Sequence, residues 1–273
     1  MRAADSALAV RHAVALGLLQ GPAELLPISS SGHTTLAPWF AGSSHAGLDG
    51  ELRKSLDVAL HAGAGVALAI DMHEELLAQL RGMDRTRASV IVLSLAPAAL
   101  AGFALRAPIE HYLSGPRSIA AGLAMGALAM AVADARAPAE GRADEEALAL
   151  DGLALGLAQA AALIPGVSRN GATLTAARAR GFSRAGAQSL SWELALPVIL
   201  AATTLKAGRL MRHGVLPRTR VPLAAGAASS FVSTLLSARI LSREGRANHS
   251  LLPYAVYRWL LAGAVAIRLR RMG

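Results

Sequence analysis

The chain has 273 residues, of which 53% are hydrophobic and only 16% are charged, and its mean hydropathy is +0.42. An ordinary soluble domain carries about 25% charged residues. Too few charges remain here to cover many apolar helices in water, which favours a membrane protein over the alternative of a soluble all-α core. The net charge of +9 is spread over short stretches between apolar blocks, which favours anionic lipid headgroups over nucleic acid as the partner. Because cysteine is absent, a disulfide framework and a thiolate metal site are excluded as well.

Polar residues interrupt the first apolar segment of the chain, which reads QGPAELLPISSSGHTTLAPW from Gln20 to Trp39. Pro22, Pro27 and Gly32 lie inside it. Proline removes a backbone donor, and glycine tolerates unusual dihedral angles. The pattern therefore predicts a helix, a short break and a second helix in this segment.

Seven further apolar blocks follow, and several approach the roughly 17 to 25 residues that a helix needs to cross the hydrocarbon core. The shorter blocks are expected to be re-entrant or interfacial. Small residues are frequent in the blocks and favour close helix packing. The sequence thus predicts an all-α integral membrane protein that is a multi-spanning helix bundle. The blocks are Leu56–Ile70, Ala88–Leu105, Ile119–Ala133, Ala147–Ile164, Leu190–Leu205, Val221–Leu241 and Tyr254–Ile267.

The chain contains an internal repeat, since ALGLLQ at Ala15–Gln20 recurs as ALGLAQ at Ala154–Gln159. Ser30 in PISSSG follows the first copy by ten residues, and Ser168 in PGVSRNG follows the second by nine. Chance likeness in a sequence rich in Ala, Leu and Gly is the alternative. We predict a single membrane domain, 1–273, with one repeat over about 1–134 and another over about 147–273. A polar loop at 135–146 would join them.

The second copy is interrupted as well, at Pro165, Gly166 and Gly171. Repeats in membrane proteins often have opposite topology, and their interrupted helices meet near a shared polar site. Broken backbone at membrane depth is tolerated where it lines a cavity or is buried in protein. We therefore predict inverted-topology repeats with re-entrant broken helices that form the walls of one site. The basic stretches 81–87 and 206–220 leave the orientation in the membrane open.

The first break carries a candidate metal and acid-base group. Gln20 and Glu24 are four residues apart, so their side chains share one helix face. A carboxylate beside an amide oxygen suits a hard cation such as Mg²⁺ or Ca²⁺. The alternative is that Glu24 pairs with an arginine for packing alone.

Ser29, Ser30 and Ser31 precede Gly32 and His33 in the same break. Hydroxyls and backbone amides at a helix break can hold phosphate oxygens. His33 is a candidate general acid or base, or a nucleophile toward phosphorus. A plain loop is the alternative, and the position of these residues in an apolar run just after Glu24 speaks against it.

The second break supplies the opposite charge. PGVSRNGAT places Arg169 between Ser168 and Asn170, with Thr173 one turn further. Arginine is always charged and forks two hydrogen bonds toward phosphate oxygens. The alternative is that Arg169 snorkels to the membrane interface. Taken together, the residues of the two breaks predict a membrane enzyme that acts on a lipid phosphate or diphosphate.

Both breaks closely resemble motifs of the bacterial undecaprenyl-diphosphatase family of the bacitracin-resistance type. The family's first motif is Glu or Gln, Gly, two residues and Glu, followed by Leu-Pro-(Val/Ile)-Ser-Ser-(Ser/Thr)-Gly-His, and here it reads QGPAELLPISSSGH. The second, Pro-Gly-x-Ser-Arg-Ser-Gly-(Ala/Ser)-Thr, reads PGVSRNGAT. Weaker likenesses cover most of the chain, among them LPYAVYRWLLAGAVA with its pair Tyr257 and Arg258.

The resemblance implies a bacterial inner-membrane enzyme that converts undecaprenyl diphosphate to undecaprenyl phosphate and phosphate, and so recycles the lipid carrier for cell-wall polymers. It also implies a divalent cation and a site that opens toward the outer face. Under it, Glu24 is a metal-associated or acid-base carboxylate, Ser30 and His33 are the candidate nucleophile or proton-transfer groups, and Arg169 is the diphosphate clamp. Which of Ser30 and His33 attacks phosphorus stays open.

The chain departs from the family pattern in two places. Asn170 replaces a serine, and Ser189 lies where the family usually has a glutamate, while Glu193 follows four residues later. A catalytically weakened paralogue is therefore one alternative. Another is a polyprenyl-phosphate transporter, because inverted repeats with broken helices also occur in transporters. The small-residue pattern GLAMG at Gly122–Gly126 permits a homodimer.

Overall fold

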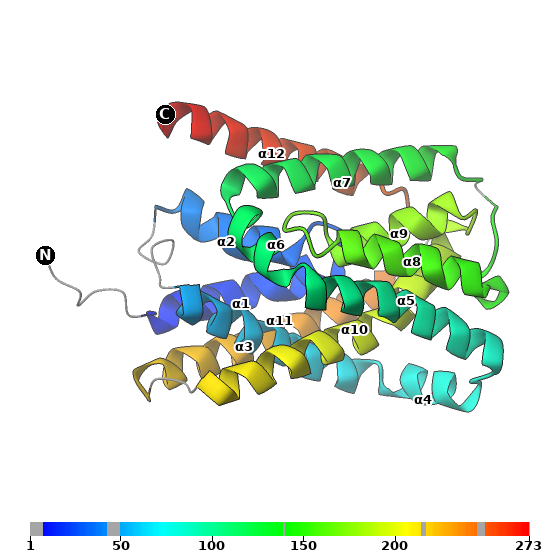
Figure 1. Ribbon diagram of the computed structural model, residues 1–273, viewed down its shortest axis with the longest axis horizontal. Coiled ribbons are helices and arrows are strands. Elements are labelled where there is room, and N and C mark those ends of the chain that lie inside the picture. Colours follow the sequence, from blue (N-terminus) through cyan, green and yellow to red (C-terminus); the bar gives the residue numbers. More distant parts are fainter. Residues whose placement is uncertain (1–7, 43–49, 139, 214–216, 245–248, 273) are drawn as a thin grey trace, which may run out of the picture. The chain divides into compact units, whose positions relative to one another are not determined.

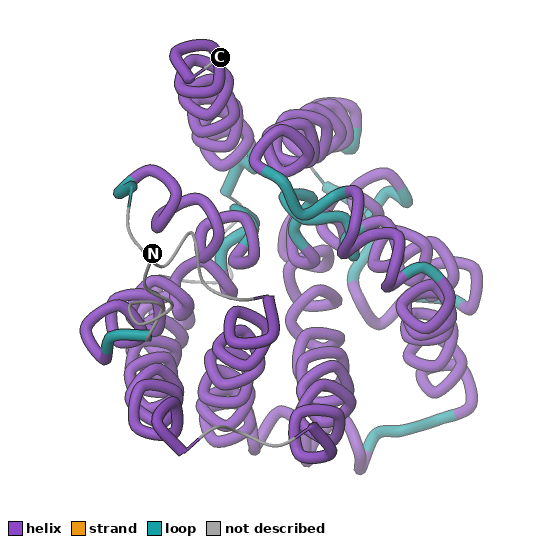
Figure 2. The backbone as a smooth tube through the Cα atoms, turned by 60° about the vertical axis from the view of Figure 1, so that its left-hand side comes forward, coloured by secondary structure: helices purple, strands orange, loops and turns teal. Residues whose placement is uncertain are grey.

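The computed structural model describes residues 8–42, 50–138, 140–213, 217–244 and 249–272. These residues are almost entirely helical (Figures 1 and 2), which confirms the predicted all-α class. The α-helices are α1 (Val10–Leu25), α2 (Ser30–Phe40), α3 (Gly50–Asp71), α4 (His73–Arg81), α5 (Arg85–Ala104), α6 (Arg106–Tyr112), α7 (Pro116–Arg136), α8 (Ala149–Ala161), α9 (Arg169–Ala179), α10 (Arg184–His213), α11 (Arg220–Glu244) and α12 (Leu252–Met272). Two short 3-10 helices, η2 (Asp144–Glu146) and η3 (Pro217–Thr219), complete the set.

Three of these helices are long and apolar enough to cross a membrane: α5, α7 and the part of α11 from Arg220 to Leu241. The pair α3 and α4 passes the same test together but is bent by 66° at its break. Each predicted apolar block overlaps one helix. The block 147–164 holds only the 13 residues of α8, which is too short to span the hydrocarbon core.

The predicted connection at 135–146 is partly helical. The last turn of α7 extends to Arg136, and η2 occupies Asp144–Glu146. Residue 139 of this connection, and residues 214–216 of the second basic stretch, lie outside the described residues. The extent of the two repeats stays a prediction.

The chain forms two compact units, and the first comprises residues 1–25, 33–76 and 196–243. In its interior α1 and α3 both pack closely against α11. A Cβ atom at Gly63 would lie 2.1 Å from the carbonyl oxygen of Ala227, and one at Gly17 would lie 2.6 Å from that of Gly226. Only glycine permits such close approach of two backbones. Ser230 adds a hydrogen bond from Oγ to the carbonyl oxygen of Leu60, at 2.7 Å.

The second unit comprises residues 26–32, 77–195 and 244–273. Its helices α5 and α8 lie in close contact, since a Cβ atom at Gly156 would lie 2.3 Å from the carbonyl oxygen of Leu93. Gln159 on α8 donates from Nε2 to the carbonyl oxygen of Ser94 on α5, at 2.9 Å. A cluster of buried apolar side chains from α5, α7, α8, α9, α10 and α12 forms the core of this unit.

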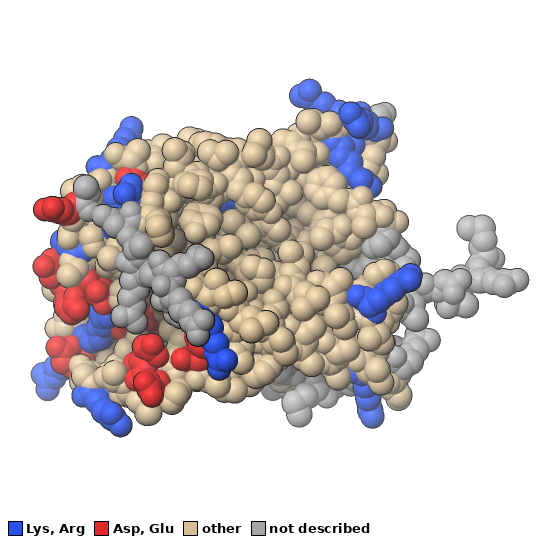
Figure 3. All heavy atoms as spheres, turned by 180° about the vertical axis from the view of Figure 1, so that it is seen from behind, with Lys and Arg blue, Asp and Glu red and all other residues tan. Residues whose placement is uncertain are grey.

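Helices α7 and α12 run antiparallel and side by side (Figures 1 and 2). Trp259 donates from Nε1 to the carbonyl oxygen of Ala124 at 3.1 Å, and the backbone N–H of Leu251 donates to Asp134 Oδ2 at 3.1 Å. Leu260 and Ile267 on the outer side of α12 are more than half exposed. Figure 3 shows a group of basic side chains at the upper right, where α12 ends in RLRR. An exposed apolar stretch that ends in arginines is typical of a helix whose outer face contacts lipid.

The GLAMG pattern on α7 is used inside the chain. A Cβ atom at Gly122 would lie 2.5 Å from the carbonyl oxygen of Pro165, and one at Gly126 would lie 2.2 Å from Nη2 of Arg258. Both glycines therefore make room for neighbours within the second unit. These glycines therefore do not support the predicted homodimer, which stays a prediction.

Each predicted copy of the helix, break and helix pattern is present. The first copy forms α1, a break at residues 26–29 and α2, and the second forms α8, a break at residues 162–168 and α9. Helices from different copies pack together, because α1 of the first copy contacts α11 of the second and α8 of the second copy contacts α5 of the first. With the predicted extents of the repeats, each compact unit would therefore contain helices of both.

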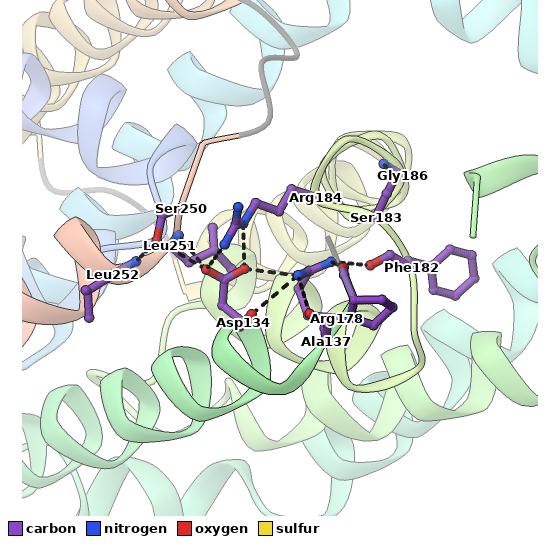
Figure 4. A network of polar contacts seen from close by, with 11 residues as sticks. Asp134, Ala137, Arg178, Phe182, Ser183, Arg184, Gly186, Ser250, Leu251 and Leu252 are labelled. Carbon is purple, nitrogen blue, oxygen red and sulfur yellow. Dashed lines mark hydrogen bonds and ion pairs between the residues drawn. The ribbon is translucent and has the colours of Figure 1, made fainter. Parts of the chain in front are cut away.

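Asp134, near the end of α7, fixes the polar end of the second unit (Figure 4). Its Oδ1 atom accepts from Nε of Arg178 at 3.0 Å and from Nε of Arg184 at 2.9 Å. Its Oδ2 atom accepts from Nη2 of Arg184 and from the backbone N–H of Leu251. A single buried carboxylate thus joins α7, α9, α10 and the start of α12.

Replacing Asp134 with asparagine should lower the free energy of unfolding by about 3 kcal/mol, because removing one partner leaves the buried guanidinium of Arg178 uncompensated. The loss should appear as a lower melting temperature in detergent, with the kcat of the folded fraction little changed. Glu145→Gln, which alters an exposed carboxylate in η2, is the matched control. Equal melting temperatures for the two variants would contradict the assigned role of Asp134.

Candidate active site

The first break turns at Ser29, whose φ of 78° lies in a region that residues other than glycine rarely adopt. The side chain of Ser29 is buried, and its Oγ atom accepts from the backbone N–H of Gly32 at 3.3 Å. That bond satisfies one of the free amides at the start of α2. Ser29 therefore caps the helix that carries Ser30, Ser31 and His33.

The second break has the same geometry. Ser168 has a φ of 71° and a ψ of 118°, and its Oγ atom accepts from the backbone N–H of Gly171 at 3.1 Å. Such backbone conformations cost about 1 to 3 kcal/mol each and persist where the surrounding structure fixes them. Among the described residues, Ser29 and Ser168 are the only ones other than glycine with a positive φ. Both strained positions fall in the predicted breaks.

The matching geometry sets the register of the repeat. Ser168 follows Ser29 by 139 residues, the same offset that separates Ala154 from Ala15. Counted from Gln20 and Gln159, which are also 139 residues apart, Ser29 aligns with Ser168, and Ser30 lies one residue further along. Arg169 is the counterpart of Ser30, and Asn170 is the counterpart of Ser31. The two copies place a hydroxyl and a guanidinium at the same position of their respective helices.

The first turn of α9 is held by a network of polar side chains. Ser191 on α10 donates from Oγ to Oδ1 of Asn170 at 2.8 Å, and its Oγ lies 2.6 Å from Oγ1 of Thr173. Arg169 donates from Nη1 to the carbonyl oxygen of Ser191 at 3.4 Å. Asn170, Thr173 and Ser191 are buried, whereas Arg169 is half-buried. The amide at position 170 is thus accommodated by its neighbours.

Gln20 and Glu24 lie together on α1 in the first unit, as predicted. Nε2 of Gln20 donates to Oε2 of Glu24 at 3.2 Å, and both side chains are buried. His61 on α3 lies on the other side of Glu24, with Nε2 at 3.9 Å from Oε2. The Nδ1 atom of His61 lies 2.8 Å from the carbonyl oxygen and 3.2 Å from Oδ1 of Asp57. His61 therefore lies near the carboxylate of Glu24 and is itself held by Asp57, and the sequence prediction included neither residue.

The donor set around Glu24 fits a divalent cation in part. Glu24 and Gln20 supply one carboxylate and one amide oxygen, and no cluster of three His, Asp or Glu side chains able to hold a metal ion occurs in the described part of the chain. Mg²⁺ commonly binds through one or two carboxylates and completes its shell with water and substrate phosphates. The residues present match that mode and do not form a closed protein cage.

Ser189 and Glu193, at the departure from the family pattern, belong to an ion network. Glu193 is buried, and its Oε1 atom accepts from Nε of Arg87 at 2.7 Å. Ser189 donates from Oγ to Oδ2 of Asp144 at 2.8 Å, and Asp144 lies 3.5 Å from Nη2 of Arg87. Glu193 is therefore engaged by Arg87 within the second unit.

The nearby connection between α7 and α8 is anchored by a second ion pair. Arg142 donates from Nη2 to Oδ2 of the buried Asp151 at 2.8 Å. This hydrogen bond raises the pKa of Arg142 above its ordinary value. The guanidinium also lies 4.3 Å from the ring centroid of Phe182. These contacts keep the connection close to the ends of α8 and α9.

The predicted site residues are thus distributed over both units. Ser29, Ser30 and Ser31 lie in the second unit with Ser168, Arg169, Asn170 and Thr173, whereas Gln20, Glu24 and His33 lie in the first. Glu24 is only five residues from Ser29, and His33 directly follows Gly32, so the covalent chain itself limits their separation. The joining of all these side chains in one catalytic site stays a prediction.

Ser191 and Arg258 were also missed as contributors to the breaks. Arg258 is fully buried on α12, and a charged residue inside an apolar helix is a signal that the sequence does offer. Ser191 gave no such signal, because a serine in a helix of this composition is unremarkable. Its contact with Asn170 depends on how α10 packs against α9.

The fold and the two capped breaks define an all-helical integral membrane protein with two interrupted helices, whose breaks are followed by helix starts that carry hydroxyls, an amide side chain and an arginine. Such a constellation suits a lipid-linked phosphate. The sequence model described as "Bacitracin resistance protein BacA" matches residues 13–264, and the chain belongs to this family.

Several relatives carry the name undecaprenyl-diphosphatase. The protein of Geobacter sulfurreducens is 40% identical over 268 residues, which cover 94% of this chain and 97% of the relative. That of Geobacter metallireducens is 40% identical over 265 residues, covering 93% and 95%. That of Rubrobacter xylanophilus is 35% identical over 274 residues, covering 95% and 98%.

Proposed function

We propose that this chain is an undecaprenyl-diphosphate phosphatase, which hydrolyses undecaprenyl diphosphate to undecaprenyl phosphate and inorganic phosphate. Water is consumed, the bond between the terminal phosphorus and the bridging oxygen breaks, and the bridging oxygen leaves with the lipid phosphate. The reaction returns the lipid carrier to the synthesis of peptidoglycan and other wall polymers, and it accounts for bacitracin resistance. The names of the relatives support the substrate.

The observation that carries the proposal is the pair of matched breaks. Each opens a helix with a strained, capping serine, and one places Arg169 at the first position of α9. The start of a helix presents free backbone amides and the positive end of its dipole, which favour phosphate oxygens. We assign Ser29, Ser31, Ser168, Asn170 and Thr173 to binding the diphosphate or to positioning the groups that bind it.

The catalytic roles follow from the chemistry of the side chains. Arg169 stabilises the charge that develops on the phosphate oxygens, and Glu24 acts as an acid-base group or as a ligand to a cation. Ser30 or His33 attacks phosphorus, and the other transfers protons. A divalent cation held by Glu24 and Gln20, when bound, would supply additional positive charge to the phosphate oxygens.

The enzyme purified in detergent should release phosphate from undecaprenyl diphosphate with Mg²⁺ or Ca²⁺ and should stop when a chelator is added. Rapid quenching with labelled substrate should trap a phosphoryl-enzyme that identifies the nucleophile. Phosphoserine survives acid, whereas phosphohistidine is lost in acid and survives base. Ser30→Ala should abolish the first species and His33→Ala the second. A folded wild-type protein that releases no phosphate with any cation would contradict the assigned function and favour transport of a lipid phosphate.

We further propose that the protein resides in the bacterial inner membrane with its active site toward the outer face. The hydrophobic helices and the lipid substrate support the membrane location. Because the chain has no cysteine, single cysteines can be introduced without a background signal. A cysteine at Ser30 should react with a membrane-impermeant maleimide in intact spheroplasts, and reaction only after lysis would reverse the proposed orientation.

A further inference from the structure

Arg258 on α12 is a buried cation that the proposed reaction does not use. Its side chain is 0% exposed. Its guanidinium donates only to backbone carbonyl oxygens: Nη1 to that of Pro27 at 3.4 Å, and Nη2 to those of Val167 at 2.8 Å, Gly166 at 3.0 Å and Gly122 at 3.4 Å. No carboxylate contacts it in the part of the chain that the structure describes. A buried arginine without an acidic partner is costly, so a compensating role is expected.

Three of the four carbonyl groups that Arg258 contacts, those of Pro27, Gly166 and Val167, lie in the breaks, and the fourth, that of Gly122, lies within α7. A carbonyl at the end of a helix has no amide four residues further on, and burial makes such a group costly unless another donor reaches it. Arg258 reaches both breaks with one side chain. The forked guanidinium has five N–H donors in a fixed plane, which lysine does not have.

Arg258 donates hydrogen bonds to the two breaks at equivalent positions of the repeat. Pro27 lies two residues before Ser29, and Gly166 lies two residues before Ser168. Gly166 follows Pro27 by 139 residues, which is the offset of the repeat. Arg258 therefore donates to the same carbonyl of both copies, just before each strained serine. Its bonds set the separation of the two breaks directly.

The surroundings of the guanidinium are shaped to admit it. A Cβ atom at Gly126 would lie 2.2 Å from Nη2, and one at Gly171 would lie 2.8 Å from Nη1. Gly171 belongs to the first turn of α9, next to Asn170 and Arg169. The guanidinium thus packs against the first turn of α9, which carries Arg169.

We infer that Arg258 is a positioning residue for the phosphatase reaction: it holds the Ser29–Ser31 turn and the Ser168–Asn170 turn at a fixed separation, so that groups from both copies face one diphosphate. This inference rests on the proposed function for its kinetic consequence. The physical link itself, a guanidinium that bonds equivalent carbonyls of two breaks, is independent of the reaction.

The test compares Arg258→Lys with Arg270→Lys, a matched change at an exposed position of the same helix. Lysine keeps the positive charge but lacks the planar guanidinium that donates to several carbonyl oxygens at once. Arg258→Lys should lower kcat about 10- to 100-fold while KM changes less than about threefold, because a displacement of about 1 Å in a catalytic arrangement costs up to about 100-fold in rate. Arg270→Lys should retain wild-type kcat and KM. A selective rise in KM, or unchanged kinetics, for Arg258→Lys would overturn the inference.

A second readout does not depend on activity. Spin labels at cysteines replacing Leu26 and Leu163 report the separation of the two breaks within the second unit. The distance distribution should be narrow with Arg258, broad with Arg258→Lys and narrow with Arg270→Lys. An unchanged distribution in Arg258→Lys would refute the positioning role even if activity fell. A narrow distribution in a wild-type protein that releases no phosphate would instead locate the failure in the proposed function.

A variant that displaces the guanidinium covers the case in which Arg258→Lys does not fold. Gly126→Ala places a methyl group where Nη2 lies and should reproduce both the loss of kcat and the broadened distribution. Gly115→Ala, at the N-cap position just before α7 with open space around the added atom, is its control and should change neither. Equal behaviour of these two alanine variants would also refute the inference.

Discussion

Replacing Arg169 with lysine should lower kcat/KM for undecaprenyl diphosphate about 1000-fold, a loss of about 4 kcal/mol of transition-state stabilisation. Lysine keeps one positive charge but cannot donate two parallel hydrogen bonds to phosphate oxygens. In this fold it also cannot reproduce the bond from Arg169 to the carbonyl oxygen of Ser191. Both kcat and KM should be affected, because the proposed clamp would bind the diphosphate in the ground state as well.

Arg180→Lys is the matched control for Arg169→Lys. Arg180 lies just beyond the other end of α9, is exposed, and pairs with Asp151 through Nε at 2.7 Å. Lysine at this exposed position keeps the positive charge that faces the buried carboxylate of Asp151. This variant should therefore keep nearly wild-type kinetics. Steady-state phosphate release in detergent measures both variants. If Arg169→Lys retained more than a tenth of the wild-type kcat/KM, Arg169 would not be the residue that binds the diphosphate.

Replacing Glu24 with glutamine should lower kcat about 100- to 10,000-fold, the range associated with loss of an acid-base group. The change keeps the shape of the side chain and its contact with Gln20, so the fold should persist. If Glu24 also holds the cation, the concentration of Mg²⁺ that gives half-maximal activity should rise in the same variant. A titration of phosphate release against free Mg²⁺ separates the two contributions.

The control for Glu24→Gln is Glu51→Gln, which removes an exposed carboxylate at the start of α3. It should leave kcat and the Mg²⁺ dependence unchanged. A Glu24→Gln variant that melts normally and turns over at a rate close to wild type would show that the carboxylate has no catalytic part. A change in kcat without any shift in the Mg²⁺ titration would keep the acid-base role and reject the cation role.

The positions of the breaks could be predicted because proline and glycine act locally. Pro27 in one copy, and Pro165 and Gly166 in the other, lie in the breaks and limit helix formation without reference to the rest of the chain. The prediction was wrong for Pro22, Gly32 and Gly171, which lie inside α1, α2 and α9. The strained residues could not be predicted in the same way. Ser29 and Ser168 adopt a positive φ only because their side chains cap the following helices and the surrounding structure holds them.

The roles of Arg258 and Glu193 could not be predicted, because they depend on packing between helices distant in sequence. Arg258 lies 231 residues from Pro27, and Glu193 lies 106 residues from Arg87. The apolar pattern places α10 and α12 correctly, yet it does not say which neighbours their charged residues meet. Arg258 could have been singled out as a charge in an apolar helix, but its partners are backbone carbonyls, which leave no mark in the sequence.

Helices made early in synthesis pack against helices made late, since α1 contacts α11 and α5 contacts α8. When the ribosome has completed the first half of the chain, α1 has been made but α11, whose backbone Gly17 of α1 approaches, has not. The face of α1 that packs against α11 stays uncovered until the second half of the chain has been made. The face of α5 that packs against α8 stays uncovered in the same way. A gene cut in the connection between the copies would therefore encode two fragments that are each incomplete alone, yet complementary when made in the same cell.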